Sequence, residues 1–180
     1  GYGVSTSAIW GLGSLSPSPD VTRRCQSMVE AAVHKHHLTP MLDLKEVVGL
    51  VDSICVDSDV TMLRLAEIQG RHCGGFMTSM IEGSETVSDA LKVLLTFNCL
   101  HAQPIYWTPR VRGEHVSFAI WVDRPAGVSV AQSERMAAFG MLQFCAGFSA
   151  LLGDIFKPTV LRFKPSQAGP DWPSQFMGIP

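Results

Sequence analysis

Residues 105–122 read IYWTPRVRGEHVSFAIWV, and this stretch decides the fold class. Its two halves, 105–111 and 116–122, alternate between apolar and polar side chains, as β-strands with one buried face do. The intervening residues 112–114 predict a hairpin turn, and a turn centred on 112–113 or on 113–114 gives the same facing. The face that we expect to be buried carries Ile105, Trp107, Val111, Val116, Phe118, Ile120 and Val122.

The other face of this hairpin carries Tyr106, Thr108, Arg110, Arg112, Ser117 and Trp121. A solvated face is the simplest interpretation, because one face of an antiparallel sheet commonly meets water. The alternative is a face that binds a partner or an anionic ligand. Both interpretations stay open at this point.

Helices are predicted on both sides of the hairpin, because apolar residues recur there at three- and four-residue steps. The predicted ranges are 21–36, 43–56, 60–68, 76–81 and 86–100, then a long helix from Ser129 or Ser133 to Leu152. The glycine-bounded segment 70–75 is expected to be a turn, and residues 159–164 alternate as a third strand would. The predicted fold class is therefore α+β, with a small antiparallel sheet (the hairpin plus a further strand) packed against several helices.

Capping residues mark the starts of three of these helices. Asp20, the pair Asp43 and Glu46, and the pair Thr86 and Asp89 each offer side-chain oxygens to the first helical N–H groups, which have no partner within the helix. The first helix should bury the stripe Val21, Cys25, Met28, Val29 and Ala32.

Composition narrows the class of protein. The chain has 180 residues, 17% charged, with a net charge of −2, so it is globular and has no basic footprint for nucleic acid. No apolar run reaches the roughly 18–20 residues of a membrane helix, and residues 1–5 do not resemble a signal peptide. Five widely spaced cysteines without a C-x-x-C pair favour a reduced, cytoplasmic chain. Residues 1–20, rich in Gly, Ser and Pro, predict a flexible N-terminal arm, and residues 21–180 one domain.

Catalytic and metal motifs are weak in this sequence. It has no phosphate-binding glycine loop, no H-E-x-x-H and no G-x-S-x-G. His34 and His37 could share a metal, but no third ligand is near in sequence, and solvated imidazoles at a helix C-terminus are the simpler interpretation. His72 and Cys73 are adjacent in sequence, which is not the facing geometry of a catalytic dyad. We therefore expect no catalytic residues, no metal site and no cofactor.

Polar residues on otherwise apolar faces suggest a ligand pocket. Asn98 and His101 continue the stripe of Leu94, so they are either satisfied core side chains or polar anchors in the wall of a pocket. Gln143 lies among small residues of the long helix, where close helix packing is the alternative. The residues expected to line a pocket between helices and sheet are Phe76, Met80, Leu94, Asn98, His101, Trp107, Phe118 and Gln143.

Several short motifs follow one another along the stretch from Asp43 to Phe176. They are Asp57-Ser58-Asp59, Leu63-Arg64-Leu65, Gly75-Phe76-Met77, Thr86-Val87-Ser88-Asp89-Ala90-Leu91, Leu100-His101, Phe156-Lys157-Pro158, Val160-Leu161-Arg162-Phe163 and Phe176-Met177-Gly178-Ile179-Pro180. In this order they resemble the N-terminal domain of AraC-type transcription regulators, in the subgroup named for arabinose binding.

This resemblance implies a bacterial, cytoplasmic sensor domain of a transcription activator. Residues 21–180 would bind a small effector, neutral or amphipathic, and would control a C-terminal helix-turn-helix DNA-binding domain that is absent from this chain. DNA would be contacted only through that domain, and a homodimer is possible. The alternatives are a dimerisation module without ligand and a small hydrolase that uses His72, Cys73 or His101.

Overall fold

The computed structural model describes residues 3–9, 11–12, 18–35, 41–55, 59–72, 76–103, 105–124, 126–156 and 158–162. The strands are β1 (Gly3–Ser5), β2 (Met41–Asp43), β3 (Ile105–Arg112) and β4 (His115–Val122). The α-helices are α2 (Pro19–Lys35), α3 (Leu44–Cys55), α4 (Asp59–His72), α5 (Phe76–Glu82), α6 (Val87–His101) and α7 (Val130–Leu152). Two 3₁₀ turns, η1 (Thr6–Ile9) and η2 (Gly153–Ile155), complete the described elements.

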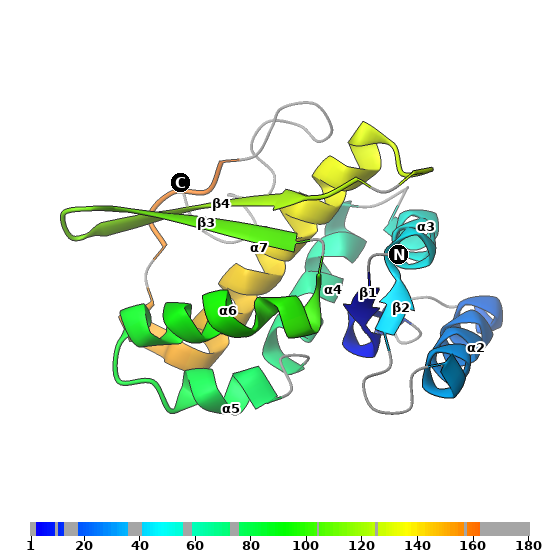
Figure 1. The fold of residues 1–180 in the computed structure, drawn as a ribbon, viewed down its shortest axis with the longest axis horizontal. Coiled ribbons are helices and arrows are strands. Elements are labelled where there is room, and N and C mark those ends of the chain that lie inside the picture. The colour runs from blue at the N-terminus through cyan, green and yellow to red at the C-terminus, as the bar shows by residue number, and fades with distance from the viewer. Residues whose placement is uncertain are drawn as a thin grey trace.

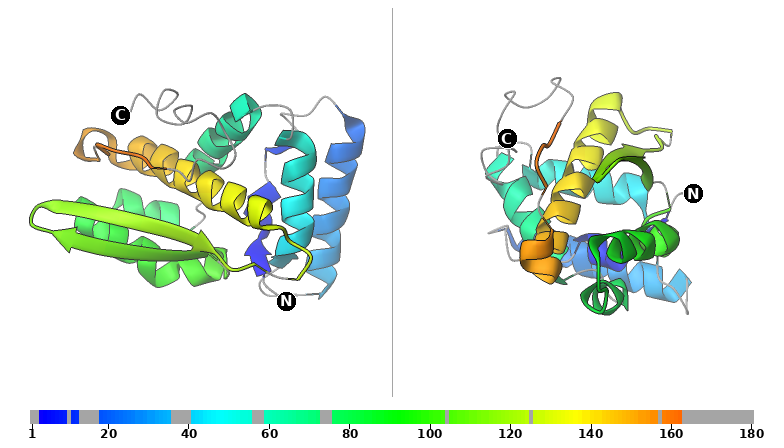
Figure 2. Two further views of the ribbon diagram at one scale, coloured as in Figure 1. Left: turned by 90° about the horizontal axis from the view of Figure 1, so that it is seen from above. Right: turned by 90° about the vertical axis from the view of Figure 1, so that its left-hand side faces the viewer.

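The described elements form an α+β fold, which confirms the predicted class. Two antiparallel strand pairs, β1–β2 and β3–β4, pack among the helices. Helices α2 and α3 both lie at one end of the molecule, and the tip of the β3–β4 hairpin reaches the other end (Figures 1 and 2). The predicted third strand is not seen: residues 159–162 have no regular secondary structure, and residues 163 and 164 lie outside the described part.

The hairpin has the predicted facing and a two-residue turn on residues 113 and 114. Arg112 is paired with His115, and Gly113 has φ +60°, which suits the first central position of a type II′ turn. The expectation of a fully buried apolar face is wrong at the tip, where Val111 is 72% and Val116 45% exposed. The base of the hairpin packs against α7, whereas its tip extends past the helices (Figure 1).

Helix α7 is the central helix of the fold. Ser129 caps it, since its hydroxyl accepts from the N–H of Gln132 while the Gln132 side chain accepts from the N–H of Ser129. The helix ends at Gly153 with φ +53°, so both predicted ends are confirmed, with Ser129 as the start. Near its start, Arg135 Nη1 lies 2.9 Å from Asp52 Oδ1 and Gln132 Nε2 donates to Asp52 Oδ2 at 2.8 Å. These contacts tie α7 to α3.

The segment Val130–Ile155 is long and apolar enough to cross a membrane, by length and composition alone. This corrects the expectation that no apolar run has that length. More than half of its most apolar window is buried inside the protein, as is usual for the core helix of a soluble protein. This composition is therefore weak support for a membrane span.

The buried residues form two hydrophobic clusters, and α7 contributes to both. The first contains β1, β2, α3 and α4 side chains with Met136, Phe139 and Leu142 of α7. The second contains α5 and α6 side chains with Phe144 and Phe148 of α7. Helix α2 covers the first cluster through the predicted stripe, in which Ala32 is buried and Val21, Cys25, Met28 and Val29 are partly buried.

Helices α4 and α7 cross at a pair of glycines. A Cβ on Gly70 would lie 2.8 Å from the backbone nitrogen of Gly147, so any side chain at either glycine would push the helices apart. The expectation of a turn beginning at residue 70 is wrong, because α4 continues through Gly70 to His72. This glycine is needed for close helix contact.

The N-terminal arm is not a flexible extension where the structure describes it. Strand β1 pairs with β2, and Val4 also forms a bridge with Ala102. Val4, Ile9 and Leu12 are all at most 3% exposed. These residues complete the first cluster, so the prediction of a flexible arm is wrong for residues 3–9 and 11–12.

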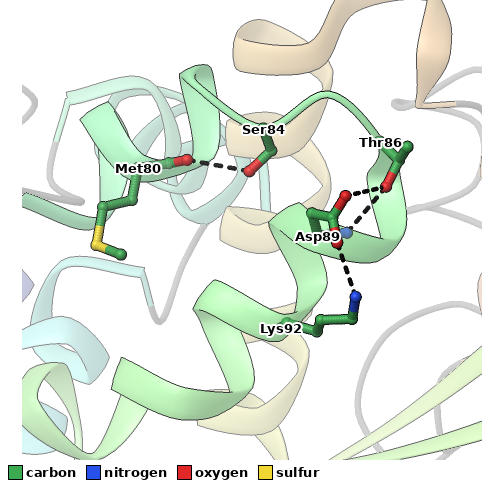
Figure 3. Close-up of polar contacts among 5 residues, drawn as sticks. All are labelled: Met80, Ser84, Thr86, Asp89 and Lys92. Atoms are coloured by element: carbon green, nitrogen blue, oxygen red, sulfur yellow. Dashed lines mark hydrogen bonds and ion pairs between the residues drawn. The ribbon is translucent and has the colours of Figure 1, made fainter.

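A polar turn joins α5 to α6, and Figure 3 shows its contacts. The hydroxyl of Ser84 donates to the carbonyl oxygen of Met80, 3.0 Å away. Thr86 caps α6, since its hydroxyl oxygen accepts from the N–H of Asp89 at 3.1 Å, as predicted. Lys92 Nζ and Thr86 Oγ1 both lie 2.7 Å from the Asp89 carboxylate. Their hydrogen bonds, that of Lys92 first, lower the pKa of Asp89.

Candidate functional site

A cavity of about 120 Å³ lies between the two hydrophobic clusters. Its walls come from β1, β3 and α3 to α7, which lie far apart in the sequence, and it is partly open to solvent. The described lining residues are Val4, Val47, Gln69, Gly70, Met77, Thr78, Ile81, Leu94, Asn98, Ala102, Ile105, Trp107, Met136, Phe139, Gly140, Gln143, Phe144, Gly147, Phe148 and Leu151. Most of these side chains are apolar, as in most small-molecule sites.

Asn98 joins the end of α6 to the start of β3. Its Nδ2 donates to the carbonyl oxygen of Ile105 at 2.7 Å and, more weakly, to that of Ala102 at 3.5 Å. Its Oδ1 accepts from Trp107 Nε1 at 3.2 Å. Of the two interpretations left open by the sequence, the structure favours the satisfied core side chain, because these contacts engage both ends of the buried amide.

Gln143 and Gln69 form a second polar contact across the crossing of α7 and α4. Gln143 Nε2 donates to Gln69 Oε1, and Gln69 is only 1% exposed. No described residue donates a hydrogen bond to the other amide atom, Gln143 Oε1. The cavity wall therefore contains a hydrogen-bond acceptor that a ligand or water can reach.

Aromatic rings form one side of the cavity. The ring centroids of Trp107 and Phe144 are 5.0 Å apart, and those of Phe144 and Phe148 are 4.4 Å apart. Phe118 packs on the same Phe144 ring at 5.7 Å. These distances are close to those of favourable aromatic pairs, so the aromatic wall is well packed around Phe144.

The structure brings together half of the residues predicted to line a pocket. Leu94, Asn98, Trp107 and Gln143 line the cavity. Met80 and Phe118 are not among the described lining residues: Met80 is 41% exposed, and Phe118 packs against the second cluster, where its ring contacts that of Phe144. Met77, Thr78 and Ile81 of α5 line the cavity in place of Met80, and none of the described lining residues belongs to β4. The side chains of Phe76 and His101 lie outside the described part of the structure.

Sequence reasoning missed Gln69 and Thr78. Gln69 was missed because the predicted helix stopped at residue 68, although Gln69 lies one turn after Leu65 on the same face. Thr78 was missed because Met80 was expected on the inner face of α5, and the two residues lie on different faces of that helix. In the structure Met77 and Ile81, at four-residue spacing, are the buried residues of α5.

Catalytic groups are not assembled by the residues that the structure describes. No group of three His, Cys, Asp or Glu side chains suited to a metal ion is found among them. Cys145 is buried in the second cluster, and burial raises the pKa of its thiol to about 12. Cys73, His37 and the side chain of His72, which the sequence singled out, lie outside the described residues, and His34 is exposed at the end of α2.

No model of a known protein family matches this chain, and no curated protein matches it either.

Proposed function

We propose that this chain is the effector-sensing domain of an AraC-type transcription regulator, acting in the bacterial cytoplasm. The observation that carries the proposal is the cavity between the two hydrophobic clusters, where the sequence pattern expected a pocket. The family is proposed from the order of short sequence motifs along the chain. The protein would act as a binding module, without an enzymatic activity or a cofactor of its own.

An effector in this cavity would contact both halves of the core at once. Met77 and Leu94 belong to the second cluster, and Val4 and Phe139 belong to the first. A ligand shifts a conformational equilibrium only by binding one state more tightly than the other. A molecule that bridges both clusters favours the arrangement in which α5 and α6 are held close to β1 and α3. That arrangement would change the surface offered to an attached DNA-binding domain or to a second subunit.

Thermal unfolding of the chain against a panel of metabolites and fatty acids tests this proposal. A ligand that binds only the folded protein stabilises it by about 2.7 kcal/mol at one hundred times its Kd. Leu94→Phe, which adds a ring to the cavity wall, should abolish the shift in Tm. Leu95→Phe is the matched control, because Leu95 is the next residue of α6 and is 38% exposed. A shift that survives Leu94→Phe places the ligand elsewhere and contradicts the proposal.

Contact with DNA is proposed only through a separate domain. The chain has a net charge of −2, and neutralisation of phosphates by Lys and Arg supplies most non-specific DNA affinity. We expect no mobility shift of duplex DNA with this chain at about 0.15 M salt. A shift that weakens steeply with added salt would show that the chain itself binds DNA.

A dimerisation module remains the second candidate, and the outer face of the hairpin favours it. Trp121 is 63% and Tyr106 42% exposed, directly opposite each other on β4 and β3. Their rings form an edge-to-face pair at 6.3 Å, and the Tyr106 hydroxyl lies 3.1 Å from Asp123 Oδ2. Sedimentation measures the oligomeric state. A dimer that no compound of the panel stabilises would favour this candidate over the sensor.

A further inference from the structure

We propose that the cavity takes a small, uncharged aromatic molecule that carries one hydroxyl or N–H donor, of the phenol class. The inference rests on the proposed effector site and narrows its ligand. Four properties of the cavity support this ligand class. They are the charge of its wall, its volume, its aromatic residues and the hydrogen-bonding groups that other residues do not occupy.

The first property is the absence of charge. None of the described residues that line the cavity is Asp, Glu, Lys, Arg or His. An ionised carboxylate or ammonium placed there would lose its hydration without gaining a counter-charge, at a cost far above that of a neutral group. Carboxylic acids, amines and phosphorylated metabolites are therefore disfavoured as ligands.

The second property is size. The cavity measures about 120 Å³, somewhat less than the engineered apolar cavity of about 150 Å³ that binds benzene. A molecule built on one six-membered ring therefore matches the volume of this cavity. A long acyl chain or a nucleotide exceeds this volume.

The third property is the aromatic wall. The cavity is lined by Phe139, Phe144, Phe148 and Trp107. The Phe144 ring makes tilted contacts with Phe148 at 4.4 Å and with Trp107 at 5.0 Å. Aromatic rings gain from offset or edge contacts with one another beyond simple burial of area. A flat aromatic ring therefore fits this wall better than an aliphatic ring of the same volume.

The fourth property is the pairing of the amide groups in the wall, which also contains the hydroxyl of Thr78. Asn98 is engaged at both ends by Trp107, Ile105 and Ala102, so it adds little to ligand binding. Gln143 gives Nε2 to Gln69, and its Oε1 accepts no hydrogen bond from the described residues. An acceptor in an apolar wall selects a ligand with a donor, because a ligand without one leaves it unpaired.

Binding of phenol and of toluene to the whole chain, by calorimetry, tests the inference. The two molecules have nearly the same shape and differ in the hydroxyl group. We expect saturable binding of phenol that Leu94→Phe abolishes and Leu95→Phe preserves. Gln143→Leu should weaken phenol binding about three- to tenfold and leave toluene binding unchanged. Benzoate at neutral pH should bind at least about a hundredfold more weakly than phenol.

The outcomes separate this inference from the proposed function. Binding of benzoate as tight as that of phenol, or equal loss of phenol and toluene affinity in Gln143→Leu, overturns the ligand class and leaves the sensor site standing. The same holds if only a non-aromatic compound of the panel gives a shift that Leu94→Phe removes. If no compound of any class binds, both proposals fall. Should Gln143→Leu not fold, a wild-type preference for toluene over phenol overturns the role of Gln143.

Discussion

Gly70 of α4 and Gly147 of α7 touch backbone to backbone. A Cβ added to Gly147 would lie 2.7 Å from the carbonyl oxygen of Gly70, and one added to Gly70 would lie 2.8 Å from the nitrogen of Gly147. Both distances are shorter than real Cβ contacts allow. The crossing also holds Gln69 next to Gln143, so it shapes one wall of the cavity.

Gly147→Ala is expected to destabilise the fold by about 1–3 kcal/mol, because the helices must separate to admit the methyl group. Urea unfolding measures the change. Gly49→Ala is the control, since Gly49 lies inside α3 with nothing within 4 Å of an added Cβ. That substitution should instead raise stability by up to about 1 kcal/mol. Equal effects of the two alanines would contradict the close crossing.

Asn98→Leu is expected to cost about 1–3 kcal/mol, because it leaves Trp107 Nε1 and the carbonyl of Ile105 without their partner in a buried place. A double-mutant cycle with Trp107→Phe isolates the side-chain contact, which we expect to contribute about 0.5–1.5 kcal/mol. Chemical denaturation of the four proteins gives both values. Strict additivity of the two substitutions would show that the amide and the indole do not interact.

Thr86→Ala is expected to lower stability by about 1 kcal/mol through loss of the helix cap. Thr86→Ser keeps the hydroxyl oxygen that accepts from Asp89 and should recover most of the loss. Thermal and urea unfolding of both variants, with helicity followed by circular dichroism, measure the effect. A serine variant as unstable as the alanine variant would argue against the cap.

Because the pKa of Asp89 is lowered in the folded protein, part of the free energy of unfolding should depend on pH. Hydrogen bonds from Lys92 and then Thr86 favour its ionised form in the folded state. That stabilisation is therefore present above the unfolded value of 3.8 and is lost as the pH falls through the lower folded pKa. Asp89→Asn should flatten this acid-side loss in unfolding measured between about pH 3 and pH 7. An Asp89→Asn protein that keeps the wild-type dependence would contradict this role of Asp89.

Cys145 should resist alkylation in the folded protein. Its pKa of about 12 leaves almost no thiolate near neutral pH, and the side chain is 1% exposed. Cys25, on the outer helix α2, is partly exposed and should react first. Iodoacetamide labelling followed by peptide mass spectrometry measures both rates. Modification of native Cys145 at the rate of Cys25 would contradict its place in the core.

The parts of the fold that local rules determine were predictable from the sequence. Alternation of side chains determines the facing of the hairpin, and the hydroxyl groups of Thr86 and Ser129 mark two helix starts. These features depend on neighbours within a few residues. The exposed tip at Val111 and Val116 was not predictable in this way, because burial depends on how far the helices beneath the hairpin extend.

Gly70 shows why other features of the fold could not be predicted from the sequence alone. A glycine in an apolar segment indicates either a turn or a close contact between helices, and only the position of Gly147, 77 residues later in the sequence, decides between them. The candidate site follows the same pattern. The helix face of Asn98 and the strand face of Trp107 predicted that both line the cavity. Gln69 was missed because the predicted helix ended one residue before it.

The division of α7 between the two hydrophobic clusters also affects synthesis of the chain. Leu142 belongs to the first cluster and Phe144, two residues later, to the second. Neither cluster can close until this helix has left the ribosome. At about 5–20 residues per second, the roughly fifty residues between the end of α6 at His101 and the end of α7 at Leu152 take about 3–10 s. During that interval the apolar faces of α3 to α6 stay uncovered on the nascent chain, which makes this stage the one most exposed to aggregation and to capture by chaperones.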